Sequence, residues 1–132
     1  MSDLLPGSFA GETVLLFKKE LQQQEITGLV SEAVLWVARE CHKEIDDFIG
    51  HIKVIGEDCF GNRVYCSFTS PEQGVAPIFS QQTPQVKQMT LTWNCLVYGL
   101  TSTKLESILF GLEQWIKKWP HCQEVMQKSF SA

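Results

Sequence analysis

The sequence has no long apolar run and no targeting segment. No stretch approaches the roughly 20 consecutive apolar residues that a membrane-spanning helix needs. The first ten residues have no basic segment ahead of an apolar one, and Pro6 and Gly7 interrupt the apolar pair that precedes them. This pattern is not that of a signal peptide. We therefore expect a cytoplasmic protein with no membrane partner.

Sequence motifs typical of nucleotide-binding sites, zinc sites and catalytic nucleophiles are also missing. Neither G-x-x-x-x-G-K-[ST] nor G-x-G-x-x-G occurs, so nucleotide binding is not supported. No C-x-x-C or H-x-x-x-H pair supplies the close ligand spacing of a zinc site. There is no G-x-S-x-G element and no evident pair of nucleophile and base. We predict no catalytic residue, no metal ligand and no cofactor, and so no enzyme.

What is present is the composition of an ordinary globular chain. Hydrophobic residues make up 44% and charged residues 20% of the 132 positions, which suits one domain covering residues 1–132. The five cysteines are odd in number and scattered, which favours reduced, buried thiols over a disulfide framework. A net charge of -4 repels phosphate, so nucleic acid is not an expected partner.

Two helices are predicted in the first third of the chain. Over residues 10–24, Val14, Phe17 and Leu21 recur at helical spacing, although the apolar run 14–17 alone also suits a strand. Residues 29–44 carry a second apolar stripe at the same period. The turn signal Thr27–Gly28 between the two helices predicts that they pack antiparallel.

Three strands are predicted after these helices. Residues 48–55 and 63–69 alternate in polarity around a turn at 57–62, which is typical of a β-hairpin. Residues 86–98 show the longest alternation. The side chains expected on the core face are Val64, Cys66, Phe68, Leu91, Trp93 and Cys95.

The connecting and final segments complete the predicted fold. Residues 70–85 contain three prolines and form a long loop, of the kind that is usually functional or mobile. Thr103 and Glu106 form a capping box for a helix that ends at Trp119–Pro120. Residues 121–132 are expected to form a short helix. The order is α-α-β-β-β-α, an α+β fold with a three-stranded antiparallel sheet and helices on one face.

The opposite face of the sheet is the predicted binding surface. It would present His51, Lys53, Tyr65, Ser67, Thr90, Thr92, Asn94, Leu96 and Tyr98. A solvated face is the alternative interpretation, since antiparallel sheets commonly have one. Ile49, Ile55 and Leu96 add more apolar area than such a face needs. The candidate contact residues are His51, Lys53, Tyr65, Ser67, Asn94 and Tyr98.

One segment suggests a family. The string Gly50-His51-Ile52-Lys53 in residues 49–53, followed by residues 64–70, resembles a strand pair in the C-terminal part of CobW-type GTP-binding proteins. That resemblance implies a stand-alone accessory domain linked to metal or cobalamin handling. It carries no GTPase activity, because the P-loop half of the family and its C-x-C-C-type motif are absent. His51 and Lys53 are the only positions that the resemblance transfers.

Two functional hypotheses follow. The first is a non-enzymatic interaction or accessory domain, forming a homodimer or binding another protein through the open sheet face and the 70–85 loop. The alternative is a small-ligand or metal-binding domain centred on His51, with Lys53, Tyr65 and Asn94.

Overall fold

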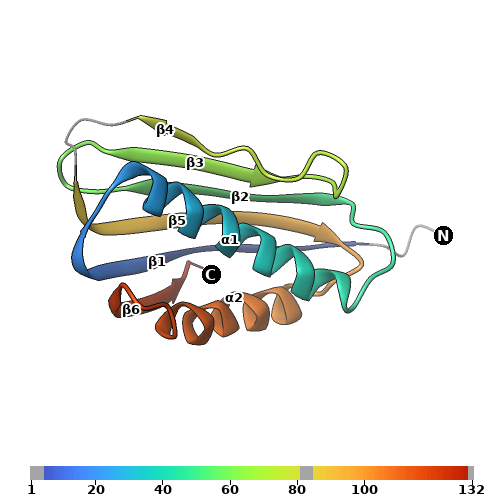
Figure 1. Ribbon diagram of the computed structural model, residues 1–132. Coiled ribbons are helices and arrows are strands. Elements are labelled where there is room, and N and C mark those ends of the chain that lie inside the picture. Colours follow the sequence, from blue (N-terminus) through green and yellow to red (C-terminus); the bar gives the residue numbers. More distant parts are fainter. Residues whose placement is uncertain (1–4, 81–84, 131–132) are drawn as a thin grey trace.

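The computed structural model describes residues 5–80 and 85–130 (Figure 1). Within these residues the chain forms one six-stranded antiparallel sheet in the order β4-β3-β2-β5-β1-β6, with two helices packed on one face. The strands are β1 (Pro6–Leu21), β2 (Gly50–Glu57), β3 (Arg63–Phe68), β4 (Ile78–Ser80), β5 (Val86–Tyr98) and β6 (Cys122–Ser129), and the helices are α1 (Gln23–His42) and α2 (Ser102–Lys117). No helix in the described residues is long and apolar enough to cross a membrane.

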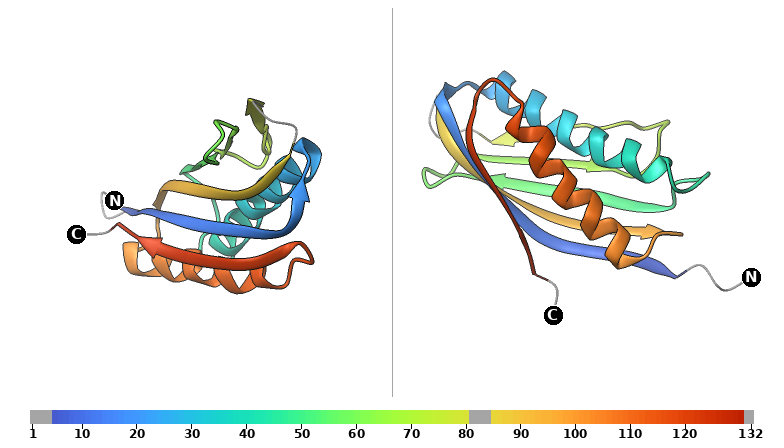
Figure 2. Two further views of the ribbon diagram at one scale, coloured as in Figure 1. Left: turned by 90° about the vertical axis from the view of Figure 1, so that its left-hand side faces the viewer. Right: turned by 90° about the horizontal axis from the view of Figure 1, so that it is seen from below.

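The predicted α+β class holds, but the predicted three-stranded sheet is wrong. The first predicted helix, over residues 10–24, is the long strand β1, which lies between β5 and β6 (Figure 2). Phe9, Thr13, Leu15 and Phe17 point into the core, whereas alternate residues such as Val14 and Leu16 point to the other face. The helical spacing of Val14, Phe17 and Leu21 was therefore misleading. Pairing with two distant strands outweighs the local preference of the lysines and glutamates at the end of this segment.

The predicted start and end of the chain also change. Residues 6–9, which precede the first predicted helix, begin β1, and residues 1–4 lie outside the described residues. Residues 121–132, expected to be a short helix, instead contain β6, an outer strand that pairs with β1 through the register Val14↔Met126. Only Cys122 and Gln127 of this strand are buried, so apolar and polar side chains do not alternate along it. The strand was therefore missed.

Both remaining helices were found with shifted starts. Helix α1 begins at Gln23. Thr27 and Gly28, which were predicted to form a turn between two helices, therefore lie inside it. A capping box between Gln22 and Glu25 closes its first turn. Helix α2 is capped two residues earlier than predicted. The Thr101 hydroxyl, rather than that of Thr103, accepts a hydrogen bond from the Lys104 backbone amide at 3.0 Å.

The hairpin and the long strand were predicted correctly. Strands β2 and β3 pair antiparallel across the turn, and β5 joins the other edge of β2. All six side chains predicted for the core face are at most 3% exposed: Val64, Cys66, Phe68, Leu91, Trp93 and Cys95. They pack under the apolar faces of α1 and α2, so the core lies between the sheet and the helix layer (Figure 2).

The segment 70–85, predicted as a long loop, contains regular structure. The Gln73 amide donates to the Ser70 carbonyl in a turn, and Val75 bridges to Phe68. Residues 78–80 then form β4, which pairs with β3. The remaining residues 81–84 lie outside the described part. The described portion of this segment is thus the edge of the sheet, and it places Ile78 on the face opposite the helices.

Candidate functional site

The six predicted contact residues share the sheet face that the helices leave open. Lys53 stands opposite Asn94 on β5 and Ser67 on β3, so these three form one row across the sheet. His51 lies in the next row, opposite Leu96, and Tyr98 lies at the end of β5. Tyr65, the sixth, stands opposite Ile55. The prediction that these side chains share one face is confirmed, because strand alternation fixed it.

An apolar row crosses this face at its β4 side. Ile78, Tyr65 and Ile55 stand opposite one another on β4, β3 and β2, with 66%, 36% and 42% of their surfaces exposed. Together with Arg63 and Ser80 they line a hollow of about 210 Å³. We call Ile55, Tyr65 and Ile78 the apolar row. Ile78 was missed in the sequence because its strand lay within the apparent loop.

Other exposed hydrophobic side chains lie at the margins of the same face. Ile49 and Tyr98 line a hollow at one end, and Met126 on β6, 58% exposed, stands opposite Val14. Between these margins the rows are polar, with Lys53, Asn94 and the pair Glu12↔Lys128. The face therefore combines exposed apolar patches at its margins with polar rows between them.

The two edges of the sheet differ in how open they are to strand addition. On one side β4 has only three residues. On the other side the Gln127 amide of β6 donates to the Glu113 carboxylate of α2 at 3.3 Å. Short edge strands and side-chain covers are the usual protection against edge pairing. Strand β4 is therefore a poor template for strand addition, and one backbone amide of β6 is covered.

The metal-binding alternative gains no further ligand from the structure. Within the described residues, no three His, Cys, Asp or Glu side chains gather closely enough to hold an ion. His51 has Leu96 as its cross-strand neighbour on β5, and Tyr65 lies two rows away on β3.

Most of the cysteines are core residues. Cys41, Cys66 and Cys95 are fully buried, and burial raises the pKa of each thiol, to about 12 for Cys41. A buried thiol with a raised pKa is a poor nucleophile. Cys59, in the β2–β3 turn, is exposed.

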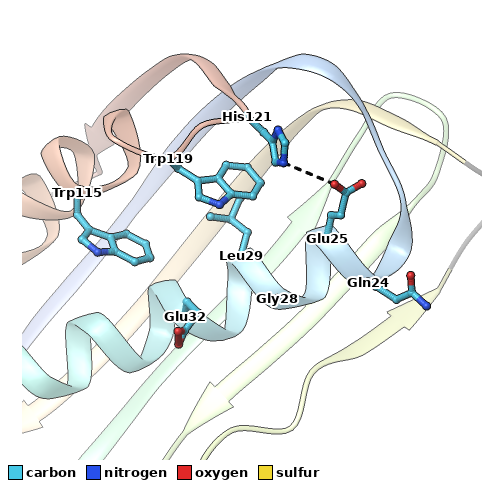
Figure 3. A pocket seen from close by; sticks show the side chains of 8 residues that line it. All are labelled: Gln24, Glu25, Gly28, Leu29, Glu32, Trp115, Trp119 and His121. Atoms are coloured by element: carbon cyan, nitrogen blue, oxygen red, sulfur yellow. Dashed lines mark ion pairs between the residues drawn. The ribbon is translucent and has the colours of Figure 1, made fainter.

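A further hollow lies on the other side of the molecule, between α1 and the end of α2 (Figure 3). The Trp115 and Trp119 indoles project toward α1, and Leu29 lies beside Trp119. This aromatic groove has a volume of about 450 Å³ and is lined by Gln24, Glu25, Gly28, Leu29, Glu32, Trp115, Trp119 and His121. In the sequence both tryptophans lie in the helix predicted to end at Trp119–Pro120, and neither was a candidate site residue. Their four-residue spacing was the only signal for a shared exposed face.

Charged side chains stand at one end of the aromatic groove. The Glu25 carboxylate lies 3.3 Å from the Lys19 ammonium. It also lies 3.6 Å from the His121 ring (Figure 3). The Gln22 amide donates to this carboxylate at 3.1 Å. That hydrogen bond, followed by the Lys19 charge, lowers the pKa of Glu25. Glu25 is therefore an anion with its own partners.

Comparisons with known proteins found no match: no family model, no curated protein and no solved structure resembles this chain significantly. The resemblance of the β2–β3 segment to CobW-type proteins therefore stays a prediction.

Proposed function

We propose that this chain is a non-enzymatic interaction module that self-associates by packing the open sheet face of one copy against that of another. The observation that carries the proposal is the apolar row of Ile55, Tyr65 and Ile78 on a face that the chain's own helices leave uncovered. Exposed apolar side chains in one continuous row are costly in water, at about 25 cal/mol per Å² of surface that stays unburied.

A second copy is the simplest occupant because the face carries charges of both signs. Arg63 and Glu57 already form an ion pair with each other at 3.3 Å, whereas Lys53 and Glu12 are further charges of opposite sign on strands of this sheet. A two-fold axis brings the same patch of both copies together. Basic positions of one copy then face acidic positions of the other, while the apolar rows pack in the centre or along one side.

Light scattering after size exclusion tests self-association. We expect a dimer for the unaltered protein at high micromolar concentration, and a monomer for the double variant Ile55→Thr, Tyr65→Thr. Threonine suits a strand and keeps the fold, but it removes most of the apolar area. A monomer for the unaltered protein at that concentration would contradict the proposal.

The matched control is Phe110→Thr on α2. Phe110 is 41% exposed, close to the values of Ile55 and Tyr65, but it lies in the helix layer and not on the open face. We expect this variant to remain a dimer. If the Phe110 variant dissociates and the double strand variant does not, copies associate through the helices, and the proposed surface is wrong.

A further inference from the structure

The aromatic groove is built from side chains that are held in place and yet keep exposed surface. Trp115 stacks on Trp36 with ring centroids 6.2 Å apart and planes at 28°. Trp119 packs edge-on against the buried ring of Phe17 at 6.0 Å and against His121 at 5.0 Å. Both indoles are only partly buried. The contacts fix the rings, so their remaining surface is a preorganised wall of the groove rather than a pair of free side chains.

Gly28 lies in this wall, and the chain's own packing does not explain it. It sits inside α1, where glycine is about 1 kcal/mol less favourable than alanine. A Cβ atom added at Gly28 would have no atom within 4 Å, so no neighbour requires the gap. Gly111 on α2 differs, because a Cβ there would come 3.3 Å from the Trp36 ring. The space over Gly28 opens into the groove (Figure 3).

The charge of the groove favours a cation. Glu25 is already engaged by Lys19 and His121. Glu32, one helical turn beyond Gly28, also lines the groove and forms no ion pair within the described residues. The faces of indole rings attract cations through their quadrupole, most strongly when the cation is weakly hydrated. The exposed indole surfaces of Trp115 and Trp119, together with the Glu32 carboxylate, therefore favour an organic cation over an anion.

We propose that the aromatic groove binds an alkylated ammonium group, with Trp115 and Trp119 contacting its methyl groups, Glu32 supplying the counter-charge and Gly28 leaving the room. The groove volume of about 450 Å³ leaves room for more of a ligand than the ammonium group alone. The group is carried by a free small molecule or by a methylated lysine of a peptide; the recognition chemistry is the same. This site is on the helix side and does not depend on the open sheet face.

Choline and its uncharged isostere 3,3-dimethylbutan-1-ol test the proposal on the full chain. We expect choline to shift the indole N–H resonances of Trp115 and Trp119, and the alcohol to bind at least about tenfold more weakly. A trimethyllysine peptide and its unmethylated form distinguish the two sources of the cation. Equal binding of choline and the alcohol, or no shift at tens of millimolar choline, would overturn the proposal.

Two variants of groove residues, with a control on the sheet, test whether the cation binds in the aromatic groove. Gly28→Ala should raise the unfolding midpoint by about 3–6 °C through helix propensity while weakening choline binding, a combination that a purely structural glycine does not give. Glu32→Gln should weaken choline binding roughly two- to fivefold, whereas Glu12→Gln on the sheet should leave it unchanged. Unaltered binding in both groove variants would overturn the assignment.

Discussion

At the scale of single residues, a polar chain inside the core holds three strands together. The Trp93 indole N–H on β5 donates to the Thr13 hydroxyl on β1 at 2.9 Å, and that hydroxyl donates to the Gln127 side-chain oxygen on β6. Thr13 is completely buried and Gln127 is 7% exposed. Buried polar groups need such partners, because an unmade hydrogen bond carries the full cost of desolvation.

Replacing the central hydroxyl should therefore be costly. Thr13→Val keeps the shape of the side chain but leaves the Trp93 N–H and the Gln127 oxygen without this partner. We expect the free energy of unfolding to fall by about 1–3 kcal/mol in urea denaturation. The control Thr92→Val makes the same change on the open face of β5 and should stay within about 0.5 kcal/mol of the unaltered protein. Equal effects of the two variants would show that this chain of bonds is not stabilising.

The buried thiols make the free energy of unfolding depend on pH in the alkaline range. Burial raises the pKa of Cys41 from 9.0 to about 12. The folded protein thus keeps a proton that the unfolded chain releases above pH 9. This contribution is fully present below pH 9 and is lost as the pH rises through 12. We expect a smaller alkaline loss of unfolding free energy in Cys41→Ala than in the unaltered protein, measured by urea denaturation at several pH values. The exposed-thiol control Cys59→Ala should keep the full loss.

At the scale of elements, the start of α2 separates the sequence prediction from the structure. The sequence favoured Thr103 as the cap, but the Thr101 hydroxyl accepts from the Lys104 amide. Thr101→Ala should cost about 1 kcal/mol of unfolding free energy because this amide loses its partner. Thr103→Ala should change stability by less than about 0.5 kcal/mol. Thermal and urea unfolding of the two variants check the assignment, and the reverse order would restore the original capping box.

The elements that the sequence predicted well are those whose patterns are local. Alternation over β5 and over the β2–β3 hairpin identifies both strands and their buried residues, because the period of two is intact along each. The same alternation did not identify strand β1. Its apolar run faces the core through Leu15 and Phe17 and the open face through Val14 and Leu16, so no single period stands out. Its identity depends on β5 and β6, which lie about 80 and 110 residues further along the chain.

At the scale of the whole molecule, the sheet is twice as wide as the sequence predicted. Adding β1, β4 and β6 enlarges the open face and places Ile78 and Met126 on it. Alternation alone placed the predicted contact residues on one face, since it assigns faces without knowing the strand order. The aromatic groove was not predicted, because it needs the relative placement of two helices that are distant in sequence.

The packing of one open face on another is tested most directly by nuclear Overhauser effects between copies. In an equal mixture of isotope-labelled and unlabelled chains, isotope-filtered spectra select the Overhauser effects between a labelled and an unlabelled copy. We expect intermolecular effects between the Ile55 or Ile78 methyl groups of one copy and the Tyr65 ring of the other. Intermolecular effects confined to helix-layer side chains such as Phe110, or none at all at high micromolar concentration, would contradict the proposed dimer.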